Sequence, residues 1–255
     1  MLKNWILGGM FPLLLLFSCK NANKIANEGI EYLNAGNYIA ALNAFDEALE
    51  IDKENVLALY GRARIYAKNS ETREMAKRDL EKALPHLKSP EDELQARIVL
   101  ANIYYQYNQW KKAISVLEDA YQKGRREKRL LLHLSQYYAE NRQISKAKEV
   151  YEKALQQYAS DEDILYSYGL FLAKYLHQYK KATDYLVQSL EKAKEKGVFR
   201  YDTVLNLVKL AYLQRQYNQA FALLQELEKN IPDQEKGKIA ELKKKIQTRT
   251  WRVKL

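Results

Sequence analysis

One pattern of small and bulky residues recurs along most of this chain at intervals of 34 to 38 residues. Each copy has an alanine, then a bulky residue four positions later and, in five copies, a small residue three positions after that. The six copies are Ala41, Phe45 and Ala48; Ala76, Leu80 and Ala83; Ala113, Leu117 and Ala120; Ala147, Tyr151 and Ala154; Ala182, Leu186 and Ser189; and Ala220, Leu224 and Leu227. Residues three, four and seven positions apart share one face of a helix. Each copy therefore predicts a helix whose small side chains let another helix approach closely.

A second motif lies twelve or thirteen residues before each of these alanines. In four copies it is a small residue followed three positions later by tyrosine: Gly29 and Tyr32, Ala63 and Tyr66, Ala101 and Tyr104, and Ser135 and Tyr138. The last two copies have Gly169 with Leu172 and Val208 with Ala211. Each repeat is thus predicted to be a pair of antiparallel helices that must stack on its neighbours to bury its apolar face. The chain has only 9 Gly and 4 Pro in 255 residues, which also favours an all-α fold.

These motifs resemble the tetratricopeptide repeat (TPR), a helix-turn-helix unit of 34 residues, and the resemblance covers about residues 22–234. The first copy agrees at seven positions: Gly29, Tyr32, Gly36, Tyr38, Ala41, Phe45 and Ala48. The resemblance implies an all-α TPR solenoid of about six repeats. Their predicted bounds are 22–55, 56–93, 94–127, 128–161, 162–200 and 201–234. Residues 235–255 are predicted to form a basic capping helix and tail, with Ile239, Leu242 and Ile246 on one stripe.

The N-terminus has the plan of a signal peptide. Lys3 precedes an apolar run over residues 5–17, which is shorter than the roughly 20 residues that a membrane-spanning helix needs. Leu16, Ser18 and Cys19 resemble the lipobox of bacterial lipoproteins, although Phe17 is larger than the residue usual there. The resemblance implies a signal peptide over 1–18, an acylated Cys19 and a short linker over 19–21. Plain secretion and an uncleaved anchor are the alternatives.

That resemblance also predicts the compartment. A lipid-anchored protein of the bacterial cell envelope is expected, and Lys20 after the cysteine, instead of aspartate, favours the outer membrane over the inner one. A periplasmic or secreted protein is the alternative location. The single Cys would be consumed by acylation, so no free thiol would remain in an oxidising compartment.

The formal net charge of +10 is concentrated at the C-terminus. Residues 235–255 hold six Lys and two Arg against Glu235 and Glu241, so the rest of the chain is nearly balanced. A solvated cap is the favoured interpretation. The alternative is contact of this basic end, with Trp251 beside it, with anionic lipid headgroups. A nucleic-acid binder is a remote alternative that rests on charge alone, and no nucleic-acid partner is expected for an exported chain.

The sequence lacks the usual parts of an active site. It contains no Gly-rich phosphate loop, HExxH, nucleophile elbow or CxxC motif, and its three histidines, His86, His133 and His177, fall in three different repeats. We therefore predict no catalytic residue, no metal and no cofactor, and a chain that is not an enzyme.

In the TPR family the first helix of each pair lines a concave groove. Taking residues four apart on that face gives the candidate groove residues Tyr60, Arg64, Lys68, Asn102, Gln136, Tyr166, Lys174 and Lys209. Their amides, cations and rings suit an extended or helical peptide of acidic or neutral character. Ile98 stands beside Asn102 where the family's carboxylate clamp has lysine, so that clamp is not expected. The predicted function is a lipid-anchored scaffold or adaptor that binds protein or peptide partners in the envelope, including during assembly of envelope complexes. The alternative is a soluble exported or cytoplasmic TPR module, and the oligomeric state is left open.

Overall fold

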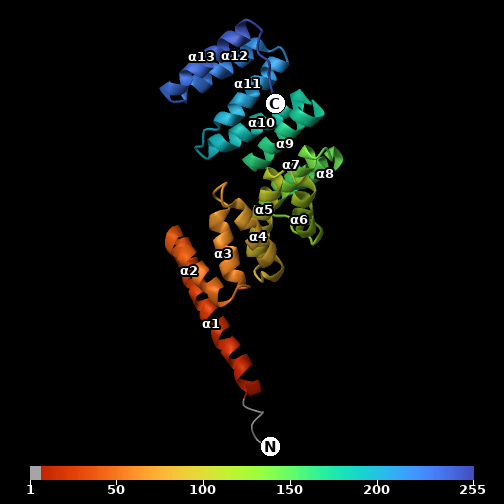
Figure 1. The fold of residues 1–255 in the computed structure, drawn as a ribbon. Helices are drawn as coiled ribbons and strands as arrows, with labels where there is room; N and C mark the ends of the chain where they lie inside the picture. The colour runs from red at the N-terminus through yellow and green to blue at the C-terminus, as the bar shows by residue number, and fades with distance from the viewer. Residues whose placement is uncertain (1–6) are drawn as a thin grey trace, which may run out of the picture. The chain divides into compact units, whose positions relative to one another are not determined.

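The structure is a computed structural model that describes the backbone of residues 7–255 and the side chains of residues 21–255. The predicted signal peptide over 1–18 and the predicted acylation site Cys19 lie outside the residues whose side chains are described. Residues 7–255 form thirteen α-helices and one short 3-10 helix, without a strand, so the all-α prediction is confirmed (Figure 1). None of the helices searched, all from the described part of the chain, is long and apolar enough to cross a membrane. The chain divides into two compact units, the first ending at Arg125 and the second beginning at Arg126.

The first unit consists of three helical hairpins. Its elements are α1 (Leu7–Asn34), α2 (Tyr38–Ile51), α3 (Val56–Tyr66), α4 (Arg73–Ala83), the 3-10 helix η1 (Leu84–His86), α5 (Pro90–Gln106) and α6 (Trp110–Gln122). The pairs α1 and α2, α3 and α4, and α5 and α6 form the hairpins, and α2 and α4 each contact the first helix of the next hairpin. This is the predicted ladder of stacked pairs.

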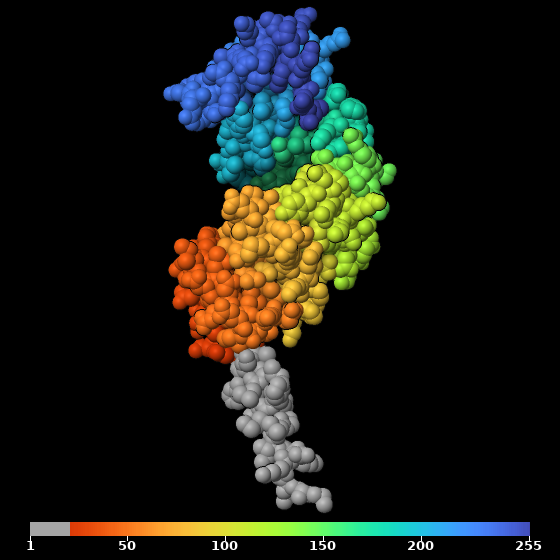
Figure 2. Space-filling view, in the orientation of Figure 1, coloured from red at the N-terminus to blue at the C-terminus, as the bar shows by residue number. Residues whose placement is uncertain are grey.

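The second unit has three more hairpins and one final helix. Its helices are α7 (Lys128–Glu140), α8 (Ile144–Gln157), α9 (Glu162–Leu176), α10 (Tyr179–Glu195), α11 (Tyr201–Leu213), α12 (Tyr217–Lys229) and α13 (Asp233–Gln247). Helix α13 packs on α12 and buries Ile239 and Ile246, which confirms the predicted capping helix. Within each unit the surface is built from successive bands of consecutive residues (Figure 2), as expected where each hairpin contacts its neighbours.

The periodic residues form the core. All six leading alanines, from Ala41 to Ala220, are fully buried, as are Phe45 and Leu224. The exposure of the tyrosine in the upstream motif differs from one repeat to another. Tyr104 and Tyr138 are buried, whereas Tyr32 is 44% exposed, because among the described helices no hairpin precedes α1 to cover that face.

Phe45 marks the closest approach of helices in the first unit. Its ring lies between the backbones of α1 and α3 at two glycines. A Cβ atom added at Gly61 would lie 2.3 Å from Phe45 Cζ, and one added at Gly29 would lie 2.6 Å from Phe45 Cε1. Because real Cβ contacts are not this short, both positions need a residue without a side chain.

Side chains that cap the helices mark where two of the hairpins begin. Helix α5 begins at Pro90, because Ser89 Oγ accepts a hydrogen bond from the Asp92 amide (3.3 Å) and proline fits the first turn. Asn55 caps α3 by accepting from the Ala58 amide (3.0 Å), and its side-chain amide donates to Asn23 Oδ1 (2.8 Å). This buried asparagine therefore ties the start of the second hairpin to α1.

Candidate partner-binding groove

In the second unit, α7 and α9 enclose a pocket of about 280 Å³ on the face of the first helices. Its lining residues are Gln136 and Glu140 of α7, Tyr151 of α8, and Tyr166, Ser167, Leu170, Phe171, Lys174 and Tyr175 of α9. Three predicted groove residues, Gln136, Tyr166 and Lys174, thus lie in one concave site. Phe171 and Tyr151 are buried and form its apolar wall, and the exposed Gln136 and Lys174 lie at its solvent side.

An ion pair joins the two helices at the edge of this pocket. Lys174 Nζ lies 3.1 Å from Glu140 Oε1 and 5.1 Å from the centre of the Tyr175 ring. Burial lowers the pKa of Lys174, but interactions with Tyr175 and Glu140 outweigh it, so the net shift is upward. Lys174 is therefore charged at neutral pH and already has an anionic partner.

Tyr166 connects the pocket to α11. Its hydroxyl accepts a hydrogen bond from Asn206 Nδ2 (3.1 Å), and the Arg200 guanidinium lies 5.2 Å from its ring centre. Burial, and next the negative charge of Asp202, raise the pKa of Tyr166 to about 12. The hydroxyl therefore stays protonated at neutral pH, and a hydrogen bond with the Asp202 carboxylate contributes to the raised pKa.

Lys209 continues this chain of polar contacts. Its ammonium donates to Asn206 Oδ1 (3.2 Å), so Asn206 connects Tyr166 of α9 with Lys209 of α11. Lys209 is half-buried, and burial lowers its pKa. The sequence analysis missed Asn206, which a search three residues before Lys209 on the same helix face would have found.

The four candidates in the first unit have different surroundings. Tyr60 is only 3% exposed, so it cannot be the open contact that the stripe predicts; burial, and next the charge of Asp92, raise its pKa to about 12. Arg64 is half-buried, with its guanidinium 5.6 Å from the Tyr60 ring centre, and Asn102 is half-buried on α5. The binding role of all these residues stays a prediction.

Lys68 does not lie on the groove helix. Helix α3 ends at Tyr66, where the Thr72 hydroxyl donates to the Tyr66 carbonyl (2.8 Å), and Lys68 lies in the turn that follows. Its ammonium donates to the Tyr38 hydroxyl (2.6 Å) and lies 3.9 Å from the Tyr38 ring centre. The predicted helical stripe from Tyr60 to Lys68 is therefore wrong at its last residue.

Sequence comparison agrees with the hairpin ladder. The model of the tetratricopeptide repeat family matches residues 27–88 and 98–162. The chain contains tetratricopeptide repeats. A curated relative, mouse tetratricopeptide repeat protein 14, is 44% identical over 46 residues, which is 18% of this chain. The chain covers only 6% of that relative's length, so the match extends over little more than one repeat.

Solved TPR structures have the same fold. PilW, described as a widely conserved type IV pilus biogenesis factor, superposes with a TM-score of 0.69 at 18% identity, covering 83% of this chain and 94% of PilW. Pseudomonas aeruginosa pilF superposes with a TM-score of 0.63 at 20% identity, and the match covers 85% of this chain and 94% of pilF. YrrB, described as a TPR protein with an unusual peptide-binding site, superposes with a TM-score of 0.56 at 21% identity. The match covers 66% of this chain and 84% of YrrB. At these identities the likeness establishes the TPR fold.

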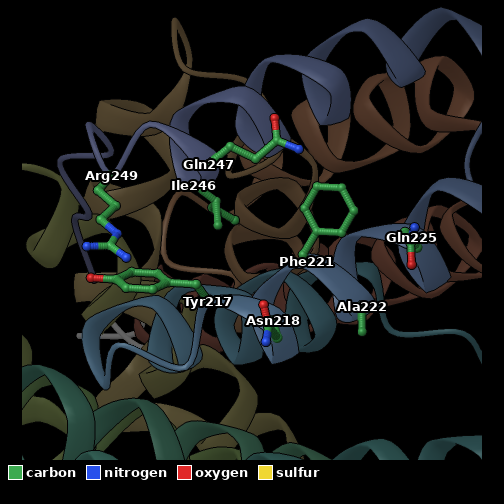
Figure 3. A pocket seen from close by; sticks show the side chains of 8 residues that line it. All are labelled: Tyr217, Asn218, Phe221, Ala222, Gln225, Ile246, Gln247 and Arg249. Carbon is green, nitrogen blue, oxygen red and sulfur yellow. The ribbon is translucent and has the colours of Figure 1, made fainter.

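A second pocket, of about 530 Å³, lies between α12, the second helix of the last hairpin, and the end of the capping helix α13 (Figure 3). Its lining residues are Tyr217, Asn218, Phe221, Ala222, Gln225, Ile246, Gln247 and Arg249. Arg249 lies over Tyr217 at one end, 5.1 Å from the ring centre, and Phe221 lies toward the other end. The sequence analysis missed this pocket because its residues lie on a second helix and on the chain end.

The basic end is largely engaged with the protein itself. Lys243 Nζ lies 2.6 Å from Glu228 Oε2, and Lys245 Nζ lies 2.6 Å from Glu241 Oε1. The backbone amide of Trp251 donates to the Tyr212 hydroxyl (3.1 Å), and the two rings lie 5.3 Å apart. These contacts support the interpretation of this end as a solvated cap over the TPR array.

In residues 21–255 no group of three His, Cys, Asp or Glu side chains is arranged to hold a metal ion. Burial, and next the charge of Arg129, lower the pKa of His133 to about 4, so this imidazole is neutral on α7. His133 lies 5.9 Å from the Tyr137 ring and acts as a packing residue there.

Proposed function

We propose that this TPR chain is a scaffold that binds a peptide segment of a protein partner in the groove of α7, α9 and α11. The observation that carries the proposal is the pocket in which Gln136, Tyr166 and Lys174, chosen from the sequence for binding, come together around Leu170 and Phe171. An apolar floor with polar groups at its edge suits a segment that inserts one apolar side chain and forms hydrogen bonds around it. The peptide-binding site described for YrrB supports this use of the fold.

A substitution at Leu170, which lines the pocket, tests directly whether the groove binds a peptide. The change Leu170→Arg places a charged side chain in the pocket, and we expect it to weaken peptide binding by at least about tenfold, since a central apolar contact is worth about 2 kcal/mol or more. Binding is measured by affinity selection of a synthetic library of ten-residue peptides on the full chain in detergent, followed by fluorescence anisotropy with the selected peptide.

The matched control is Val187→Arg. Val187 is 39% exposed on α10, outside the pocket, so the same charge there should leave peptide affinity unchanged. Circular dichroism checks that both variants are folded. Full peptide affinity in a folded Leu170→Arg variant would place the binding site elsewhere.

We further propose that the scaffold is anchored by lipid at Cys19 in the bacterial envelope, where it gathers partners during assembly of envelope complexes. The lipobox-like residues Leu16, Ser18 and Cys19 support the anchor, and the pilus role described for PilW supports such a setting. Several acyl chains attach a protein stably, because each buried CH₂ contributes about 0.8 kcal/mol. A soluble exported module is the competing possibility.

A lipid anchor at Cys19 predicts that removing this cysteine changes the cell fraction in which the chain is found. The variant Cys19→Ser should move the chain from the membrane to the soluble fraction or leave its leader uncleaved, whereas Asn21→Ser should stay in the membrane fraction. Immunoblots of fractionated bacterial cells and intact-mass measurement of the purified chain detect the two changes. A mature chain with an unmodified Cys19 thiol would contradict the anchor.

A further inference from the structure

The pocket between α12 and the end of α13 lies outside the groove of the first helices (Figure 3). Tyr217, Phe221 and Gln225 are four residues apart on α12, so their side chains share one face of that helix. Ile246, in the last turn of α13, contributes an apolar wall and is only 2% exposed. The volume of about 530 Å³ is within the range of ligand sites in proteins, roughly 300–1,000 Å³. The pocket therefore has the size and the apolar walls of a binding site.

The chain that follows α13 holds Arg249 over this pocket. Arg249 has a left-handed backbone, with φ 57°, and residues 245–250 form the two hydrogen bonds of a Schellman motif, a common helix end. The Trp251 amide then donates to the Tyr212 hydroxyl (3.1 Å). The backbone is thus fastened on both sides of Arg249, whose guanidinium lies 5.1 Å from the Tyr217 ring centre.

The lining of the pocket contains one cation, three carboxamides and no acidic side chain. Arg249 is exposed, and it forms no ion pair with a carboxylate in the part of the chain whose side chains are described. The carboxylates of Glu228 and Glu241, on α12 and α13, are paired with Lys243 and Lys245. An anionic group that enters the pocket therefore meets a cation that has no counter-charge.

The two rings and the guanidinium favour an aromatic group in this pocket over an aliphatic one. Arg249 lies over Tyr217 at one end, and Phe221 lies toward the other end (Figure 3). A ring placed between them packs against Phe221 and lies close to the guanidinium, and both contacts add to the gain from burying apolar area. The three carboxamides can donate to and accept from the backbone of a peptide on either side of that ring.

We propose that this pocket is a second docking site of the scaffold, for an aromatic side chain of a protein partner that has an acidic residue beside it. The ring occupies the space between Arg249 and Phe221, and the acidic residue pairs with the guanidinium. This site is built from a second helix and the capping helix, so it does not depend on the groove of α7, α9 and α11. A chain with two separate sites can hold two protein segments at once, as a scaffold must.

The test repeats the selection of ten-residue peptides on the Leu170→Arg chain, so that the groove is blocked. Selected peptides should share a Trp, Tyr or Phe beside an Asp or Glu. Ala222 is an exposed residue of the pocket lining, and Ala222→Glu both fills the pocket and repels an anion, so it should weaken binding at least about tenfold by fluorescence anisotropy. The matched control is Ala240→Glu, at an exposed alanine of α13 outside the pocket, which should leave the affinity unchanged.

Two further changes test the chemistry of the site. Arg249→Gln should weaken binding about tenfold, whereas Arg252→Gln, at an exposed cation outside the lining, should weaken it less than about twofold. Replacing the aromatic residue of the selected peptide with leucine should also weaken binding about tenfold. Circular dichroism checks that each variant is folded.

Three results would overturn this inference. The first is unchanged peptide affinity in a folded Ala222→Glu variant. The second is that no peptide is selected on the Leu170→Arg chain, and peptides that bind the wild-type chain through Leu170 would then leave the proposed function standing. The third is binding of phosphatidylglycerol vesicles that requires Arg249, without binding of any peptide to this pocket, since the basic end would then recognise a lipid surface.

Discussion

Replacing Arg62 with leucine should lower the free energy of unfolding of the first unit by about 3–5 kcal/mol. The guanidinium of Arg62 binds Asp79 through two hydrogen bonds, Nε to Oδ2 at 2.8 Å and Nη2 to Oδ1 at 2.9 Å, and reaches Asp46 Oδ1 at 2.7 Å. Asp79 is only 6% exposed, so removing the arginine leaves a buried carboxylate without its counter-charge. Urea unfolding of the full chain, with hydrogen exchange of α2 to α4 to locate the effect, measures the loss.

The double variant Arg62→Leu with Asp79→Leu should recover much of that stability, because replacing both members of a buried pair with apolar residues is often neutral or stabilising. The exposed pair of Lys82 and Glu54, at 3.4 Å, provides the comparison. The change Lys82→Leu should alter stability by less than about 1 kcal/mol. An equally small effect of Arg62→Leu would show that the Arg62 cluster contributes no more than a surface ion pair.

Replacing Gly61 with alanine should destabilise the first unit, although alanine normally favours a helix. The added Cβ would lie 2.3 Å from Cζ of Phe45, a ring that is fully buried between α1 and α3 and cannot move aside freely. Overpacking of this kind costs about 1–3 kcal/mol, and at so short a distance we expect it to exceed the gain of about 1 kcal/mol in helix propensity. Chemical unfolding and hydrogen exchange of α1 to α3 report the change.

The same substitution at Gly237 is the matched control. Gly237 lies within α13, and no atom lies within 4 Å of an added Cβ, so Gly237→Ala should stabilise the chain by up to about 1 kcal/mol. The double variant Gly61→Ala with Phe45→Leu should recover part of the lost stability, because the smaller leucine side chain leaves room for the added methyl group. Equal stabilisation at both glycines would refute the close packing around Phe45.

The helical hairpins and much of their core could be predicted because their signal is local. The alanines at a period near 35 residues fix which face of each helix is buried, and all six are fully buried. The start of α5 at Pro90 also follows from a local signal, because Ser89 is a capping residue and proline favours the first turn of a helix. The burial of Tyr60 could not be predicted, because spacing along a helix does not reveal how far the next helices cover a side chain.

The groove could be predicted only in outline. The spacing of four placed Gln136, Tyr166 and Lys174 on one surface, and they line one pocket. The partners that set their chemistry lie 34 to 40 residues away in sequence, such as Asn206 for Tyr166 and Glu140 for Lys174. No local pattern gives those pairings, since they depend on how adjacent hairpins are rotated and stacked.

The sequence by itself determined the number of hairpins, the buried face of each helix and the capping role of α13, because small and bulky residues at helical spacing leave little choice of contact surface. Only the tertiary structure decided which charges are neutralised. Among residues 21–255, Arg62 meets two carboxylates and Lys209 meets none, although both are basic residues on the first helix of a repeat. The physical reason is that an ion pair requires two side chains within a few ångströms, and between repeats that distance is set by the packing of neighbouring hairpins.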